Sequence, residues 1–284
     1  MREDQSNKKP QKIDIREVFR SKNPGLAPYI PGFVYSYLER ILHLDFINKI
    51  LEDHGNKKDL DFVNAIKDEF NITTEIIGFE NIPENKKLIV VANHPLGGFD
   101  GTMLISLLGE KFAGVKSLTN DILMNIPNME GVFVAVNKHG KQSKDGARII
   151  DNVYKSMDPI LIFPAGLVSR RKRGIIRDLE WKKSFITKAK AYQRDVIPVH
   201  VSGRCTNFFY NLSNLRKFFG IKANLEMFFL ADETYRHRNE HIRIVLGKPV
   251  SFETYTTKLR PDEWALKMKE LVYRLEKDPN AFLE

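Results

Sequence analysis

Residues 88–101 read LIVVANHPLGGFDG: an apolar run, a turn with two adjacent glycines, and the start of a second apolar segment. The run Leu88–Ala92 is typical of a short buried strand, and Thr102–Leu108 is typical of a helix that begins at a Gly-Thr pair. His94 and Asp100 therefore belong to a strand-to-helix turn. Because ligands of α/β folds bind at the carboxyl ends of strands, this stretch predicts an α/β fold with its chemistry at this turn.

His94 and Asp100 form a pair with a defined chemical use. A neutral imidazole takes a proton from a hydroxyl only when the right ring nitrogen faces the substrate. A carboxylate on the other nitrogen fixes that tautomer and stabilises the imidazolium that forms. Gly97 and Gly98 allow backbone angles that bring Asp100 back to His94. The alternative interpretation is a loop histidine without a catalytic task and an aspartate that caps the next helix.

Polar residues also follow the apolar runs at three other places in the chain: within Gly131–Lys138, Ile162–Arg173 and Val196–Gly203. If these runs are strands of one sheet, their polar ends meet at one edge and line a single cleft. The second segment ends in the four cations 170–173, which suit a phosphate or carboxylate because guanidinium groups bind oxyanions in a bidentate manner. The alternative is a solvated basic loop.

The order of the apolar runs predicts the fold class. The candidate strands are Glu75–Gly78, Leu88–Ala92, Val115–Leu118, Val132–Val136, Ile160–Phe163, Val196–Val201, Leu225–Phe229 and Ile242–Leu246. The candidate helices between and after them are Thr102–Leu108, Asp145–Ser156, Trp181–Tyr192 and Leu259–Glu276. Continuous apolar strands that alternate with helices indicate a mixed, mostly parallel central sheet flanked by helices, with antiparallel pairs near the C-terminal end.

The N-terminal residues predict an amphipathic helical segment ahead of this sheet. Residues 1–12 resemble a disordered basic tail, and residues 13–72 contain four helical patterns ahead of the main domain, residues 73–284. These patterns are Ile13–Arg20, Pro31–Leu42, Asp45–Leu51 and Leu60–Phe70. The helices in the middle of the segment either pack on the main domain or lie on a bilayer.

A later segment, Asn207–Gly220, is both aromatic and basic. Its apolar positions 208, 212, 215 and 219 share one face of a helix. That face is either packed into the core, or exposed as a wall for an acyl chain or as an element that touches a bilayer.

Composition limits the partners and the compartment. The net charge is +9 and the isoelectric point is about 9.4, which suggests an anionic partner such as a phospholipid surface. The single cysteine, Cys205, excludes a disulfide framework and a multi-cysteine metal site. Neither a signal peptide nor a spanning apolar run is visible, so we expect a cytoplasmic protein that is peripheral on the inner face of the cell membrane.

Several motifs are missing from the sequence. It has no Gly-x-Ser-x-Gly nucleophile elbow, no P-loop, no Rossmann glycine triplet and no His-Glu-x-x-His. We expect no metal site and no nucleic-acid partner, because the basic residues are scattered and no nucleic-acid-binding motif is present.

The four polar strand ends together resemble the sequence blocks of the glycerolipid acyltransferase family, the lysophosphatidate-acyltransferase-like enzymes. The resemblance covers about residues 74–250. It implies that His94 and Asp100 are catalytic. It also implies substrate-binding roles for a further set of residues: Asn93, Gly97, Gly98, Lys138, Gly166, Ser169, Arg170 and Arg171.

Two departures from that family pattern point to one branch. Five residues rather than four separate His94 from Asp100, and Ala165 stands where the family usually has a glutamate. Together with the sequences of residues 21–24 and 93–98, these departures resemble the hemolysin-like bacterial branch of the family. That branch includes enzymes that acylate the hydroxyl of lyso-ornithine or related aminoacyl lipids.

The resemblance implies acyl transfer from an acyl carrier protein or coenzyme A thioester to the hydroxyl of a lysolipid, without another cofactor. His94 would act as the general base and Asp100 would orient it. Two alternatives stay open: a 1-acylglycerol-3-phosphate acyltransferase of ordinary phospholipid synthesis, and a non-catalytic protein that binds lipid or nucleic acid.

Overall fold

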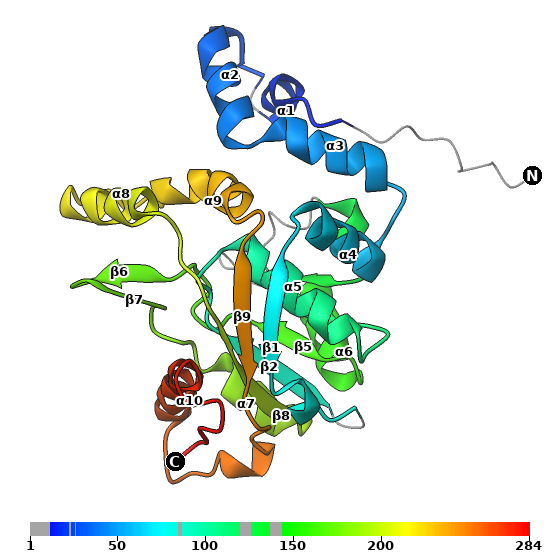
Figure 1. The fold of residues 1–284 in the computed structure, drawn as a ribbon, viewed down its shortest axis with the longest axis vertical. Helices are drawn as coiled ribbons and strands as arrows, with labels where there is room; N and C mark the ends of the chain where they lie inside the picture. Colours follow the sequence, from blue (N-terminus) through cyan, green and yellow to red (C-terminus); the bar gives the residue numbers. More distant parts are fainter. Residues whose placement is uncertain (1–11, 23, 26, 85–86, 120–125, 137–143) are drawn as a thin grey trace, which may run out of the picture.

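A computed structural model describes residues 12–22, 24–25, 27–84, 87–119, 126–136 and 144–284. A seven-stranded sheet lies between two layers of helices, and a lobe of N-terminal helices lies at one end of the molecule (Figure 1). The predicted basic tail lies outside the described residues except for Lys12.

The central sheet has a mixed topology. Its strands in spatial order are β1 (Thr73–Ile77), β9 (His241–Leu246), β8 (Asp195–Val201), β2 (Leu88–Ala92), β5 (Ile160–Ile162), β3 (Lys116–Thr119) and β4 (Phe133–Ala135). Every neighbouring pair is parallel except β8 and β9. The prediction of a mostly parallel sheet with an antiparallel pair near the C-terminal end is confirmed. The carboxyl ends of β8, β2, β5, β3 and β4 meet at one edge as a result.

Helices cover both faces of the sheet. On one face lie α4 (Asp59–Glu69) and α5 (Gly98–Gly109), which share a core with Leu88, Val90 and Ala92 of β2. On the other face lie α6 (Lys144–Lys155), α7 (Ser184–Tyr192) and α10 (Pro261–Leu275), which share a second core with the alternate β2 residues Ile89 and Val91. Every residue of β2 is buried, as expected for a strand with helices on both sides.

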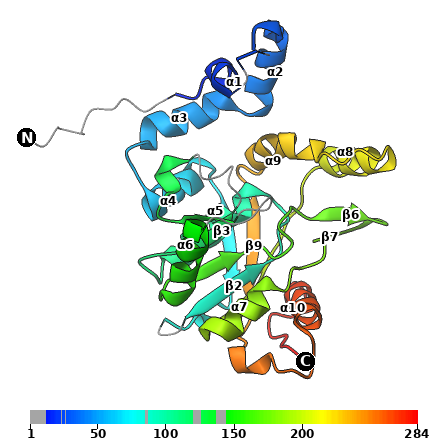
Figure 2. The same ribbon diagram turned by 180° about the vertical axis from the view of Figure 1, so that it is seen from behind.

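Several elements project from the end of the sheet at which β2 and β8 have their carboxyl termini. A short hairpin, β6 (Arg170–Lys172) and β7 (Ile175–Arg177), lies beside α8 (Asn207–Phe218), η5 (Leu225–Phe229) and α9 (Leu230–Arg236). In both Figure 1 and Figure 2, α8 extends away from the sheet above this hairpin. Further 3-10 turns are η1 (Ala27–Tyr29), η2 (Phe79–Asn81), η4 (Pro127–Met129) and η6 (Phe252–Thr254).

The prediction of a strand over Leu225–Phe229 is wrong, because this segment is the 3-10 helix η5. Its apolar residues indicated a strand, but the side chains point in different directions. Glu226 is fully buried while Phe228 is exposed. A tight turn accommodates this arrangement because its side chains repeat every three residues.

The N-terminal lobe consists of α1 (Ile15–Lys22), α2 (Gly32–Ile41) and α3 (Leu44–His54), with a small apolar cluster of its own. The lobe contacts the main domain through His43, which precedes α3, and through Phe46 of α3. His43 stacks on Tyr235 of α9 with 3.6 Å between ring centroids, and its Nε2 lies 2.7 Å from an Asp232 carboxylate oxygen. Phe46 contacts Phe70 and Tyr235 edge to face. His43 and α3 therefore pack on the domain. The alternative of a bilayer contact stays a prediction for α2.

Parts of α2 stay exposed, Phe33 most of all. Along the described parts of the chain, no helix is both long and apolar enough to cross a membrane.

Candidate active site

His94 and Asp100 meet at the carboxyl end of β2. His94 follows the strand by two residues, and Asp100 lies in the first turn of α5. The turn between them brings His94 Nδ1 to 2.8 Å from Asp100 Oδ2. Since a carboxylate only accepts hydrogen bonds, the proton belongs on Nδ1, and Nε2 keeps its lone pair. The imidazole side chain is 18% exposed, whereas Asp100 is fully buried.

The environment of Asp100 holds its carboxylate in place. Both of its oxygens accept the Leu96 N–H, at 3.2 and 3.0 Å. Burial raises the pKa of Asp100 above its ordinary value, and the hydrogen bond and charge of His94 oppose that rise. A buried carboxylate has no water with which to exchange partners. The pair is therefore fixed in one orientation before any substrate arrives.

The backbone and ring of His94 have further supports. The ring stacks on Phe163 at the end of β5, with 4.2 Å between centroids. The carbonyl of His94 accepts the Ser169 N–H at 2.8 Å, and its own N–H donates to Asp178 Oδ1 at 3.1 Å. Three segments that are distant in the sequence thus position one imidazole.

Asp178 is a positioning residue that sequence reasoning missed. Its carboxylate also accepts the Ser169 hydroxyl at 2.6 Å and the Trp181 indole N–H at 2.8 Å, and its N–H donates to the Tyr273 hydroxyl at 2.7 Å. The predicted site residue Ser169 therefore supports the His94 backbone through Asp178. Asp178 follows the unpredicted hairpin, so no apolar strand marked it in the sequence.

The predicted glycines lie at the turns of the site. Gly97 has a φ of 79°, and a Cβ there would lie 3.2 Å from Leu230. Gly98 is the first residue of α5, and Gly166 has a φ of 66° in the turn after β5. A side chain at Gly97 would combine left-handed strain with a tight contact, which explains the glycine at that position.

Asn93 has a different position from the other predicted residues. Its amide donates to the Val201 carbonyl at 2.8 Å and accepts the Val201 N–H at 2.7 Å. The side chain thus extends the pairing of β2 and β8 beyond the last strand residue. Both polar ends of its amide have partners within the protein, and substrate binding by Asn93 stays a prediction.

The three predicted cations lie in three different settings. Lys138 lies outside the described residues. Arg170 is buried and pairs with Glu226 at 3.0 Å, so its charge is neutralised within the protein rather than free for a head group. Arg171 is half-buried over the Tyr210 ring and donates to the side-chain oxygens of Asn207 and Asn211. No carboxylate contacts Arg171 among the described residues, so its charge is not balanced there.

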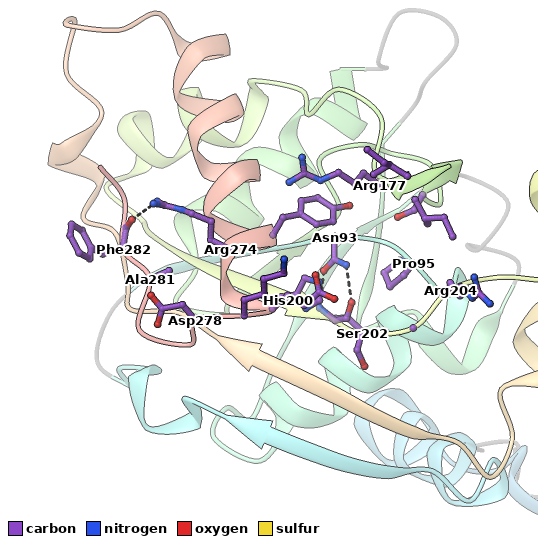
Figure 3. Close-up of a pocket in the computed structure, with 18 of the residues that line it drawn as sticks. Asn93, Pro95, Arg177, His200, Ser202, Arg204, Arg274, Asp278, Ala281 and Phe282 are labelled. Carbon is purple, nitrogen blue, oxygen red and sulfur yellow. Dashed lines mark hydrogen bonds between the residues drawn. The ribbon is translucent and has the colours of Figure 1, made fainter. Parts of the chain in front are cut away.

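A cavity of about 670 Å³ lies next to the catalytic turn. It extends from Asn93 and Pro95, which flank His94, past His200 and Ser202 of the β8 end to the C-terminal residues (Figure 3). Arg204 lies at its edge and is exposed, and no carboxylate contacts it in the described part of the chain. Burial lowers the pKa of His200, so this imidazole favours its neutral form.

The described residues contain no cluster of three or more His, Cys, Asp or Glu side chains that could hold a metal ion. Ala165 is buried against the second core. Position 165, where the glycerolipid acyltransferase family usually has a glutamate, therefore has only a methyl side chain in this protein.

The chain belongs to the acyltransferase family, whose model matches residues 17–271. It is an acyltransferase with the strand-to-helix His94–Asp100 pair at its candidate active site. It is 44% identical over 264 residues to a lyso-glycine lipid O-acyltransferase of Bacteroides thetaiotaomicron, covering 93% of this chain and 97% of that protein. A protein of the same description from Phocaeicola vulgatus is 43% identical over 264 residues, covering 93% of this chain and 95% of that one.

Among solved structures, the chain matches the 1-acyl-sn-glycerophosphate acyltransferase PlsC of Thermotoga maritima. The TM-score is 0.45 and the identity 16%, over 85% of this chain and 95% of that one.

Proposed function

We propose that this acyltransferase moves a fatty acyl group from a thioester to the hydroxyl of a lysolipid with an amino-acid head group, glycine being the best candidate. The observation that carries the proposal is the buried Asp100 carboxylate 2.8 Å from His94 Nδ1, in a chain 44% identical to a lyso-glycine lipid O-acyltransferase. The pair leaves Nε2 as an acceptor for a hydroxyl proton.

The reaction needs one base and no covalent acyl-enzyme. The acceptor oxygen attacks the thioester carbonyl carbon while His94 Nε2 takes the hydroxyl proton. Asp100 stabilises the imidazolium that forms. The tetrahedral intermediate then collapses, the C–S bond breaks, and the thiolate receives the proton from His94. The products are an ester and a free thiol.

The oxyanion of this intermediate needs N–H donors near the catalytic turn. Backbone N–H groups of residues 96–98 are candidates, since α5 begins at Gly98 and the first amides of a helix have no intrahelical acceptor. The N–H of Leu96 already donates to Asp100. The N–H groups of Gly97 and Gly98 are therefore the better candidates.

The head group of an aminoacyl lipid supplies an anion close to the reacting hydroxyl. A glycine joined to a fatty acid through its nitrogen keeps a free carboxylate. Arg171 and Arg204 are the cations near the turn that lack a carboxylate partner among the described residues. We assign the carboxylate to Arg204 first, because its loop packs on the turn: Cys205 Sγ lies 3.3 Å from the Pro95 carbonyl oxygen.

The donor is a thioester of acyl carrier protein or coenzyme A, both of which present the acyl group on a phosphopantetheine arm. A protein with net charge +9 attracts the phosphates of either donor and an anionic inner membrane surface. We place the enzyme at that surface, since its acceptor is a lipid.

The experiment offers the purified enzyme a labelled acyl thioester with two acceptors in separate reactions, N-(3-hydroxyacyl)glycine and lysophosphatidate. Product from the glycine lipid at a rate at least tenfold higher supports the proposal. A faster reaction with lysophosphatidate would show ordinary phospholipid synthesis instead, and no product from either acceptor with both donors would overturn the proposal. Arg204→Ala should raise the KM for the glycine lipid, with Lys248→Ala, an exposed cation after β9, as the matched control.

A further inference from the structure

A group of large apolar side chains is exposed on α8, on the loop that follows it and on η5. Other large apolar side chains are exposed elsewhere on the molecule, but here six of them belong to one pair of packed elements and the loop between them. Their exposed fractions lie between 42% for Ile221 and 83% for Phe218. We name this group the α8–η5 tip; it consists of Phe208, Leu215, Phe218, Phe219, Ile221 and Phe228. The helix predicted within Asn207–Gly220 is confirmed as α8. On its predicted apolar face, Phe208, Leu215 and Phe219 are exposed, and the buried contacts come from Phe209 and Tyr210 on another side of the helix.

A buried ionic triad holds the tip in a fixed position. Glu226 is fully buried and accepts hydrogen bonds from Arg170 of the hairpin at 3.0 Å and from Arg216 of α8 at 2.5 and 2.9 Å. The Ser213 hydroxyl donates to the same carboxylate at 3.2 Å. The hairpin, α8 and η5 are therefore tied to one acceptor. The exposed aromatic residues stand on a rigid support and are not the loose end of a frayed helix.

The surroundings of the tip are cationic. Six cations of the hairpin, of α8 and of their flanking loops have no carboxylate partner among the described residues: Arg171, Lys172, Arg173, Arg204, Lys217 and Lys222. Arg170 and Arg216 are instead paired with the buried Glu226, and Arg177 is paired with Glu270. Partial burial and the positive charges of Arg170, Arg216 and Lys172 lower the pKa of Lys217. Glu226 opposes this effect. The cations of α8 and the hairpin therefore lie close enough for their charges to act on one another.

The segments that flank the tip contact the catalytic turn. Leu230, directly after η5, is the residue that a side chain at Gly97 would meet. The loop that precedes α8 contacts Pro95 through Cys205. In both views of the fold, α8 and α2 lie at the same end of the molecule (Figures 1 and 2). The elements that carry the tip are therefore anchored at the catalytic turn, and α8 extends from there.

We propose that the α8–η5 tip is a docking surface that inserts its aromatic side chains into an anionic lipid bilayer and so brings His94 to the membrane interface. The inference rests on the proposed function, because a lipid acceptor has to be collected from a bilayer. The occupant follows from two features together: aromatic side chains partition into the interfacial region, and the surrounding cations attract anionic head groups. An acidic carrier protein would match the cations but would leave six large apolar side chains unexplained.

The test compares binding of the full chain to vesicles by co-sedimentation. Vesicles contain either phosphatidylcholine alone or phosphatidylcholine with about a third phosphatidylglycerol. The double variant Phe218→Ser, Phe219→Ser is compared with Met157→Ser, Leu266→Ser, which removes two exposed apolar side chains from other parts of the molecule. We expect the first variant to lose at least tenfold in partition to the anionic vesicles and the second to match the wild type.

Two further variants separate the contributions. Lys217→Glu, Lys222→Glu should abolish the preference for anionic vesicles. Phe33→Ser, Tyr37→Ser reports the contribution of α2, whose side chains are also exposed. Vesicle binding that survives the change at Phe218 and Phe219 but is lost with the α2 variant would overturn the proposal.

Activity assays keep this inference distinct from the proposed function. With a detergent-dispersed acceptor, the Phe218, Phe219 variant should retain the wild-type rate, and with the same acceptor in vesicles it should be at least tenfold slower. A rate that falls equally in detergent, with a raised KM for acyl carrier protein, would make the tip a carrier-protein site and refute bilayer docking. Vesicle binding by a protein without acyl transfer would instead defeat the proposed function alone.

Discussion

Glu226→Gln tests the buried triad that holds α8, η5 and the hairpin together. The substitution keeps the shape of the side chain but removes the negative charge that faces Arg170 and Arg216, whose side chains are 4% and 8% exposed. The amide also presents an N–H₂ group to guanidinium donors that require an acceptor. Breaking a buried ion pair on one side costs about 3–5 kcal/mol, because the remaining charge stays buried.

This free energy translates into a measurable shift. For a chain of this size, 1 kcal/mol corresponds to about 2–4 °C in Tm, so we expect Glu226→Gln to lower the Tm by about 6–20 °C. Thermal unfolding followed by circular dichroism gives the value. The matched control is Glu270→Gln, which makes the same chemical change in the exposed ion pair with Arg177. That pair contributes about 0–1 kcal/mol, so its loss should be close to the limit of detection.

The pH dependence gives the same test from another direction. Burial raises the pKa of Glu226, but the hydrogen bond from Arg216 and the charges of both arginines outweigh it, so the net pKa is lowered. A lowered carboxyl pKa contributes stability above the unfolded value near 4.5 that is lost as the pH falls through the folded value. The difference in stability between wild type and Glu226→Gln should therefore shrink below pH 4.5. A Tm for Glu226→Gln within about 2 °C of the wild type at pH 7 would refute this account of the triad.

Three other substitutions address the active site and its surroundings. Asp100→Asn should lower kcat by about 10²–10⁴ with little change in KM, because the tautomer of His94 is no longer fixed; a loss below fivefold in steady-state assays would contradict this role. Gly203→Ala should cost about 1–3 kcal/mol in urea unfolding, since its φ is +106° and a Cβ would lie 2.6 Å from Leu96, and unchanged stability would show that the loop adapts. Burial lowers the pKa of His200, so on acidification the unfolded chain binds a proton before the folded chain does. The stability that neutral His200 contributes is therefore present above about pH 6.5. It is lost below that pH, at up to about 1.4 kcal/mol per pH unit. His200→Phe should therefore lose less stability than the wild type between pH 7 and 5.5, and parallel losses would contradict that assignment.

The central part of the fold could be predicted because its signals are local. The run at Leu88–Ala92 is buried on both faces and stays apolar throughout, and the two glycines mark the turn that joins His94 to Asp100. His94 and Asp100 lie within seven positions of each other in the sequence. The structure places them in contact as the chemistry of the pair predicted.

The remaining errors come from long-range contacts that no short pattern records. Glu226 looked like one polar residue in an apolar strand, but its two arginine partners come from the hairpin and from α8. The ion pair of Arg170 with Glu226 could not be seen in the sequence for the same reason. Asp178 supports His94 across 84 positions of sequence, a distance at which one sequence gives no sign of contact.

The branch of the family could be narrowed from two local departures. The extra residue between His94 and Asp100, and Ala165 in place of a glutamate, predicted an aminoacyl lysolipid rather than lysophosphatidate. The relatives described as lyso-glycine lipid O-acyltransferases agree with that class. The lipid in the names of these relatives has a glycine head group rather than ornithine. The spacing of His94 and Asp100 and the alanine at position 165 do not specify the head group.

The most direct measurement is the rate of acyl transfer to N-(3-hydroxyacyl)glycine by His94→Ala. The control is His241→Ala, which removes an exposed imidazole at the start of β9. If His94 is the general base, kcat falls by about 10²–10⁴ while the Tm stays within a few degrees of the wild type, and His241→Ala is unaffected. A His94→Ala enzyme that retains more than a tenth of the wild-type rate would show that another group takes the proton, and the account of this site would be wrong.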